Sequence, residues 1–164
     1  LEGINEKMIS WQASKEMLGI ACKVKCKPDR FLPVGMNQGK MSEDVIVDLK
    51  TTGDVSPEAI AKTSATFSYH CQASLYIDGA MAINGGEPCR HISVFINKTP
   101  PHEIAGVEYT KEALALGREM NVQALKELAD CMAFSQFGSR TANKLTSVDL
   151  PRWFYSQWAA KNSG

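Results

Sequence analysis

The sequence lacks the features of a membrane or secreted protein. Its apolar runs all fall short of the roughly 18 residues that cross a bilayer, and no signal peptide pattern opens it. It also lacks an excess of positive charge, because 18 Lys and Arg residues balance 18 Asp and Glu residues. We therefore expect a cytoplasmic protein with no membrane partner, in which binding to nucleic acid would depend on a local basic patch.

Paired cysteines and histidine clusters are absent too. None of the five cysteines forms a Cys-x-x-Cys pair, and the three histidines show no metal-ligand spacing. Cys22 and Cys26 lie four residues apart in an alternating segment, where they should face the core together with Val24. Small buried side chains in a reducing compartment are therefore favoured over a zinc or redox site.

The length and composition are those of one globular domain. With 44% apolar residues the chain can fill a core, and we expect a single domain over residues 1–164. The chain has no initiator methionine and starts at Leu1, so we expect it to begin inside a longer gene product.

Strands are predicted where apolar and polar residues alternate or β-branched residues gather. These segments are residues 8–13, 19–27, 31–34, 45–51, 91–97 and 103–109. A polar turn should follow the first segment at residues 14–16. We expect the third and fourth segments to form an antiparallel hairpin, and the last two to pair with each other.

Two helices are predicted. The first begins at Ser56, which can cap the helix ahead of a proline and a glutamate, and it runs to about Asp78, just before a glycine. The second is a long amphipathic helix over residues 110–134. This order of elements favours an α/β sandwich around a mixed sheet. It lacks a helix in front of the first strand, and the C-terminal tail should dock through its aromatic residues.

The fourth strand segment carries an acid and a base two positions apart. In an extended strand Asp48 and Lys50 share one face, about 7 Å apart. The opposite face would then carry apolar side chains toward a core: Val45, Val47 and Leu49. The Asp-x-Lys pattern alone is common by chance. Here, however, the strand is otherwise apolar, and a buried polar pair is costly without partners.

A second acid should lie beside this pair. Asp29 follows a hairpin-forming strand that would bring it alongside Asp48. Two carboxylates suit a hard cation such as Mg²⁺, with the backbone carbonyl of Leu49 and water completing its ligands. A metal lowers the pKa of bound water, and Lys50 could orient that water or stabilise charge developing on a phosphate. The pattern therefore favours hydrolysis of phosphodiester bonds.

Two further groups of residues are open to more than one interpretation. Gln72 and Tyr76 lie four apart on one face of the first helix, and by themselves they are more often ordinary surface residues. Three alternating lysines are equally compatible with a solvated strand face and with phosphate contacts: Lys23, Lys25 and Lys27.

An ordered set of segments resembles the RecE-like exonucleases, the exonuclease VIII group in the RecB-like branch of the PD-(D/E)xK nuclease superfamily. The segments are Cys26-Lys27-Pro28-Asp29-Arg30, Val47-Asp48-Leu49-Lys50-Thr51-Thr52, Tyr69-His70-Cys71-Gln72-Ala73-Ser74-Leu75-Tyr76-Ile77-Asp78-Gly79 and the tail Leu150-Pro151-Arg152-Trp153. The resemblance extends over nearly the whole chain.

The resemblance implies a restriction-endonuclease-like α/β sandwich with a central mixed β-sheet flanked by helices. It implies that Asp29 and Asp48 bind the metal, Mg²⁺ with Mn²⁺ as a substitute, and that Lys50 is catalytic. Gln72 and Tyr76 correspond to the family's Gln-x-x-x-Tyr motif near the DNA or the active site. Glu6 corresponds less clearly to a supporting acid. The family's N-terminal helical region, with its metal-binding histidine, has no counterpart here.

The resemblance further implies an exodeoxyribonuclease that degrades linear duplex DNA from 5′ ends and leaves 3′ single-stranded tails. It implies a RecT-like single-strand annealing partner, a ring-shaped homo-oligomer, and a phage or prophage gene expressed in a bacterial host. The local phosphate contacts would be Lys23, Lys25, Lys27 and Arg30. Two other interpretations stay open: a non-catalytic DNA-binding relative, and a structural segment of a phage recombination protein.

Overall fold

The computed structural model describes residues 1–13, 22–37, 39–135, 137–138, 145 and 147–161. The chain divides into two compact units, Leu1–Asp130 and Cys131–Gly164. The turn predicted at residues 14–16 and the start of the second predicted strand lie outside the described residues. In the part of the chain that is described, no helix is both long and apolar enough to cross a bilayer.

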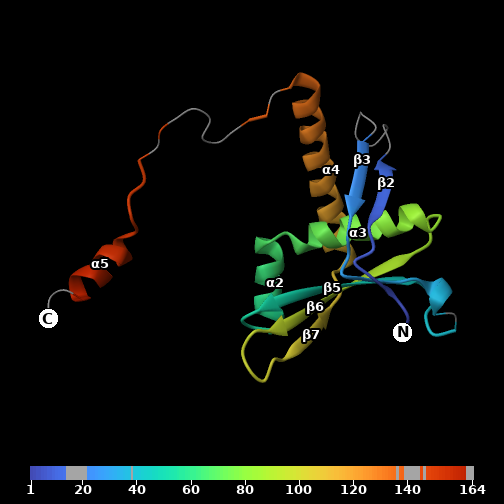
Figure 1. Ribbon diagram of the computed structural model, residues 1–164, viewed down its shortest axis with the longest axis horizontal. Coiled ribbons are helices and arrows are strands. Elements are labelled where there is room, and N and C mark those ends of the chain that lie inside the picture. Colours follow the sequence, from blue (N-terminus) through green and yellow to red (C-terminus); the bar gives the residue numbers. More distant parts are fainter. Residues whose placement is uncertain (14–21, 38, 136, 139–144, 146, 162–164) are drawn as a thin grey trace. The chain divides into compact units, whose positions relative to one another are not determined.

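A five-stranded mixed sheet forms the centre of the first unit (Figure 1). Its strands in spatial order are β1 Ile4–Asn5, β4 Arg30–Leu32, β5 Asp44–Thr52, β6 Cys89–Asn97 and β7 Ile104–Val107. Only the central pair, β5 and β6, runs parallel; the other three pairs are antiparallel. The predicted β4–β5 and β6–β7 pairings are therefore confirmed, whereas the short strand β1 was not foreseen.

A second, two-stranded sheet joins β2 (Ile9–Ala13) to β3 (Cys22–Cys26) in antiparallel register. The predicted alternation in β3 is confirmed, because Val24 and Cys26 are buried while its two lysines are exposed. A short 3₁₀ turn, η1 (Val34–Met36), follows β4.

The helices are α2 Pro57–Thr66, α3 Tyr69–Ile83, α4 Lys111–Phe134 and α5 Arg152–Lys161. Ser56 caps α2 as predicted, since its hydroxyl accepts the Ala59 N–H at 3.4 Å. The prediction of one continuous helix from this cap was wrong. Ser68 adopts a left-handed backbone (φ 54°) that ends α2 and starts α3, and so the chain can turn and run across the sheet.

The predicted end of that helix at Asp78 was also wrong, because Gly79 lies inside α3. A Cβ at Gly79 would lie 2.7 Å from the Trp11 ring of β2. Likewise, a Cβ at Gly117 of α4 would lie 2.6 Å from the His70 carbonyl oxygen of α3. These glycines permit close packing of neighbouring elements and do not act as helix stops.

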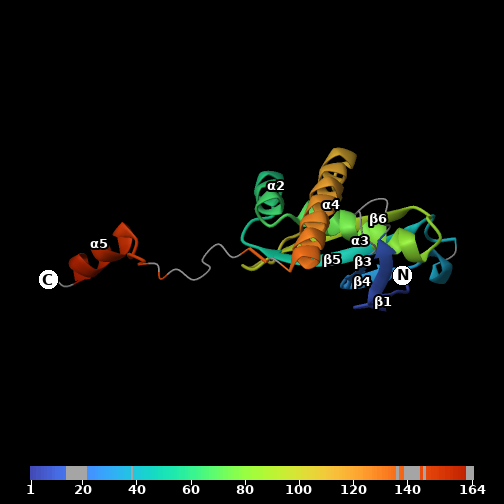
Figure 2. The ribbon, with the colours of Figure 1, turned by 90° about the horizontal axis from the view of Figure 1, so that it is seen from above.

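Helix α3 lies along one face of the main sheet (Figures 1 and 2). Two ring contacts join it to β6, Tyr69 with Phe95 at 6.1 Å and Tyr76 with His91 at 6.0 Å between centroids. Ile46, on the face of β5 that α3 covers, is 0% exposed.

This packing covers the face of β5 opposite to the predicted one, and the predicted face is buried only in part. Asp48 shares the covered face with Ile46, whereas the Leu49 side chain on the other face is 54% exposed. On that other face Val45 is buried and Val47 is half-buried. The Asp-x-Lys pair therefore points into the protein beneath α3.

In the second unit, α5 has no buried residue, and its aromatic side chains are exposed. The expected docking of this tail stays a prediction.

Candidate active site

Asp48 and Lys50 form an ion pair on the covered face of β5. Only 4% of the Asp48 side chain and 14% of the Lys50 side chain are exposed. Such a buried pair is weak evidence for stability, because the cost of removing two charges from water rivals their attraction. Its low exposure instead strengthens the electrostatic effect of these two side chains on a charged group bound beside them.

Two residues of α3 contact the Lys50 ammonium, and a third is joined to it through one of them. Its Nζ donates to Oε1 of Gln72 at 2.7 Å and lies 4.5 Å from the centre of the Tyr69 ring. Gln72 in turn donates through Nε2 to the Tyr76 hydroxyl at 3.0 Å, which donates to the Lys27 carbonyl at 3.3 Å. The structure thus brings Gln72 and Tyr76 into one network with Lys50. Sequence reasoning missed Tyr69.

Asp29 lies beside this pair, at the exposed end of the segment before β4. Its Oδ2 accepts the backbone N–H of Leu49 at 2.7 Å, and its carbonyl accepts the backbone N–H of Glu6 at 2.9 Å. These bonds fix the Asp29 carboxylate against β5, one residue beyond Asp48. The Leu49 carbonyl as a metal ligand stays a prediction.

The surroundings of Asp48 act on its pKa in opposite directions. Burial raises the pKa of Asp48, the hydrogen bond and charge of Lys50 oppose that rise, and the Asp29 charge adds to it. A divalent cation between the carboxylates would relieve this repulsion.

The donor set fits a hard cation. Asp48 Oδ2 is buried, and the partner that the described residues give it is the Lys50 ammonium. Within the described ranges no three Asp, Glu, His or Cys residues cluster as metal ligands. A cation here would therefore rely on two carboxylates with main-chain or water oxygens.

Glu6 lies at the margin of this site. It lines a hollow of about 400 Å³ with Asp29, Leu49 and three neighbours: Asn5, Arg30 and Val47. Its Oε2 accepts a hydrogen bond from Lys27 Nζ at 2.8 Å, which lowers the pKa of this exposed carboxyl. Glu6 is therefore near Asp29, but it is paired with a base.

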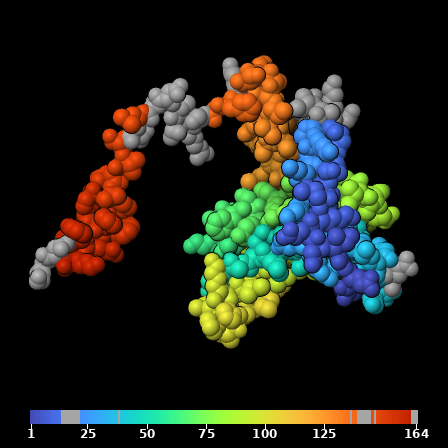
Figure 3. Space-filling view, viewed as in Figure 1, coloured from blue at the N-terminus to red at the C-terminus, as the bar shows by residue number. Residues whose placement is uncertain are grey.

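The four predicted DNA contacts fall into two groups. Lys27 is paired with Glu6, and Arg30 donates to Asn5 Oδ1 at 2.7 Å and to the Leu1 carbonyl at 3.1 Å. Lys23 and Lys25 instead lie on the exposed face of β3, in the blue segment that forms part of the outer surface in Figure 3. The second group is the better placed to meet a phosphate.

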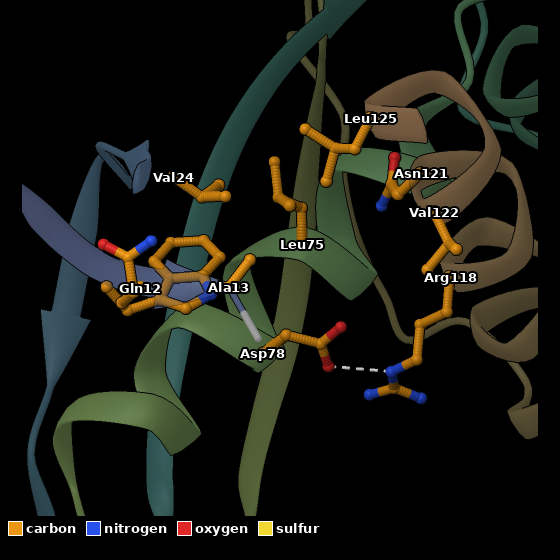
Figure 4. A pocket seen from close by; sticks show the side chains of 10 residues that line it. Gln12, Ala13, Val24, Leu75, Asp78, Arg118, Asn121, Val122 and Leu125 are labelled. Atoms are coloured by element: carbon orange, nitrogen blue, oxygen red, sulfur yellow. Dashed lines mark hydrogen bonds and ion pairs between the residues drawn. The ribbon is translucent and has the colours of Figure 1, made fainter. Parts of the chain in front are cut away.

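A separate hollow of about 250 Å³ lies among β2, β3, α3 and α4 (Figure 4). It is lined mainly by apolar side chains such as Val24, Leu75 and Leu125. The two charged residues that line it are paired with each other, because Arg118 Nε donates to Asp78 Oδ1 at 2.7 Å. None of the predicted site residues lines this hollow.

Comparison with known proteins agrees with this arrangement. Residues 2–145 match the family described as PDDEXK-like domain of unknown function (DUF3799). No curated protein matches the chain.

Two solved structures are similar. One is a "Putative exonuclease" from Eubacterium rectale, with a TM-score of 0.63 and 15% identity, covering 99% of this chain and 57% of that chain. The second, SSO0001, has a TM-score of 0.44 and 17% identity over 84% of this chain and 52% of the other, too distant to support an argument. This chain spans little more than half the length of either.

The mixed sheet flanked by helices is thus the restriction-endonuclease-like fold, as the sequence predicted. With a family match over residues 2–145, the chain belongs to the PDDEXK-like domains of the PD-(D/E)xK nuclease superfamily.

Proposed function

We propose that this protein is a Mg²⁺-dependent exodeoxyribonuclease that degrades linear duplex DNA. One observation supports this most strongly: the buried Asp48–Lys50 pair faces α3, with Asp29 fixed beside it by the Leu49 N–H. The name of the Eubacterium rectale structure, "Putative exonuclease", is consistent with this proposal.

Asp48 and Asp29 would hold the cation. When bound, Mg²⁺, or Mn²⁺ in its place, would supply Lewis acidity and a more acidic water. The role of the two carboxylates would be to hold the cation beside Lys50. Lys50 would stabilise the negative charge that develops on the phosphate, because its ammonium lies against Asp48 in a poorly solvated setting.

Gln72 and Tyr76 would act through Lys50. The 2.7 Å bond from Lys50 to Gln72 and the 3.0 Å bond from Gln72 to Tyr76 restrict the ammonium to one position. Preorganisation of this kind removes the need to order a flexible lysine during the reaction.

Binding to DNA would involve few basic residues. Lys23 and Lys25 on β3 would contact phosphates, with Lys27 and Arg30 joining if their present partners release them. Because the net charge is zero, retention on DNA would come from geometry. By its resemblance to RecE-like enzymes, we propose a ring-shaped homo-oligomer that digests 5′ to 3′ and passes 3′ tails to an annealing protein during phage recombination.

Digestion of matched DNA substrates tests this function. Linear duplex and covalently closed circles of the same sequence are incubated with the protein in Mg²⁺ and in EDTA. We expect mononucleotides or short fragments from the linear DNA, and only in the reaction that contains Mg²⁺. Cleavage of the closed circle at an equal rate would contradict the exonuclease assignment, and cleavage in EDTA would contradict the metal dependence.

A further inference from the structure

Two polar residues of β6 are buried beside Asp48, and the network described above does not use them. In the parallel β5–β6 register, Ser93 pairs with Asp48 and His91 pairs with Ile46. All four side chains are on the face covered by α3, where Ser93 is 0% and His91 5% exposed. The Tyr76 ring packs on the His91 ring at 6.0 Å between centroids. Ser93 and His91 thus lie on the strand next to Asp48, on the same covered face of the sheet.

These two residues have polar atoms without a protein partner. Among the described residues, neither ring nitrogen of His91 nor Oγ of Ser93 has a hydrogen-bond partner, and the partner of Asp48 Oδ2 is the Lys50 ammonium. Buried polar atoms are almost always bonded, either to protein or to ordered water. Three such atoms on β6, next to a carboxylate oxygen of β5 that can accept a second hydrogen bond, therefore point to a shared ligand.

Water is the ligand that these atoms suit. Neighbouring strands lie about 4.8 Å apart, so Ser93 Oγ can lie beside the Asp48 carboxylate without reaching it. A buried water needs two to four polar partners. Ser93 can donate or accept, the carboxylate accepts, and a neutral imidazole has one donor and one acceptor nitrogen. Burial lowers the pKa of His91 to about 4, which keeps the ring neutral.

We propose that Asp48, Ser93 and His91 enclose a buried water that bridges Ser93 Oγ to Asp48 Oδ2, with a ring nitrogen of His91 as its third partner. The water site stands on the geometry alone. Its consequence for the metal rests on the proposed function: by holding Oδ2, the water would fix the orientation in which the Asp48 carboxylate meets the cation. Ser93 and His91 are then positioning residues.

Two substitutions separate this role from ordinary core packing. Ser93→Ala removes the hydroxyl that holds the water. Ser74→Ala is the matched control, because Ser74 of α3 is also 0% exposed, but its Oγ already bonds the Cys71 carbonyl at 3.0 Å and Asn121 Nδ2 at 3.1 Å. Ser93→Thr restores a hydroxyl at the tested position.

The first measurement is Mn²⁺ binding without DNA, followed by electron paramagnetic resonance. Partners that orient a metal ligand typically contribute tenfold to hundredfold in metal affinity. We expect Ser93→Ala to raise the Mn²⁺ dissociation constant about tenfold or more, Ser93→Thr to recover most of that loss, and Ser74→Ala to change it less than about twofold while lowering the melting temperature. Wild-type affinity in a folded Ser93→Ala protein would overturn the positioning role.

The second measurement is a high-resolution crystal structure of the metal-free protein. We expect density for a water within hydrogen-bond distance of Ser93 Oγ and Asp48, and its loss in Ser93→Ala. A direct Ser93–Asp48 hydrogen bond without water would overturn the water site. If the wild-type protein binds no Mn²⁺, the metal part of the proposed function fails, and the crystal structure still decides the water site by itself.

Discussion

Replacing His91 should make the folded state less sensitive to mild acid. His91 is 5% exposed, and burial, with the nearby charge of Lys50, lowers its pKa from 6.5 to about 4. The unfolded chain therefore binds a proton at this residue at a pH where the folded chain does not. Stability from the buried neutral ring is fully present above pH 6.5 and is lost as the pH falls toward 4.

The size of the effect follows from these two pKa values. Between pH 7 and pH 5 the unfolded ring becomes almost fully protonated and the folded ring stays neutral. The linkage relation then gives a loss of about 2 kcal/mol in the free energy of unfolding. Asp48 acts in the opposite direction, because its raised pKa favours the folded state as the pH falls. Comparing two proteins that share Asp48 removes most of this contribution.

Urea unfolding followed by circular dichroism, at pH 7 and pH 5 in EDTA, provides the test. The wild-type protein should lose about 2 kcal/mol more than His91→Gln over this interval. His102→Gln is the matched control, because His102 is exposed and its replacement should leave the wild-type pH dependence intact. Equal losses in wild-type and His91→Gln proteins would refute the buried neutral histidine.

Three other predictions concern the active site. Lys50→Ala should lower turnover far more than DNA affinity, measured by single-turnover cleavage and gel shift; a loss confined to affinity would assign Lys50 to phosphate binding. Gln72→Leu removes the acceptor of a charged hydrogen bond and should lower turnover about tenfold to hundredfold, whereas Asp78→Asn on the same helix should not. Combined Lys23→Gln and Lys25→Gln substitutions should reduce the salt dependence of DNA binding, as the slope of log K against log salt, by about 2; an unchanged slope would exclude these phosphate contacts.

Local signals predicted much of the fold. Ser56 and the proline after it indicated the start of α2, and alternation in β3 indicated which side chains are buried. The break at Ser68 had no such signal, because neither glycine nor proline marks it. The position of the break is explained by packing, because it lets the Tyr69 ring contact both Phe67 and Phe95.

Long-range packing also decided which face of β5 is buried. Alternation places three apolar residues on the face with Leu49 and only Ile46 on the other, so it indicated the wrong face. The covering helix α3 instead buries the face with Asp48. Similarly, sequence reasoning predicted a strand at residues 91–97, but the parallel register that brings Ser93 beside Asp48 joins segments about 45 residues apart. Resemblance to a known family supplied the candidate metal ligands that pattern alone left open.

Cleavage by Asp48→Asn most directly tests the claim that β5 carries a metal-dependent nuclease site. Asp44→Asn is the matched control, because Asp44 is also buried on β5 but bonds the Val34 N–H at 2.8 Å and Asn84 Nδ2 at 3.0 Å. We predict that Asp48→Asn lowers the rate of Mg²⁺-dependent digestion of linear duplex DNA by about a hundredfold or more, while folded Asp44→Asn retains activity. Wild-type digestion by Asp48→Asn at the same Mg²⁺ concentration would contradict the account.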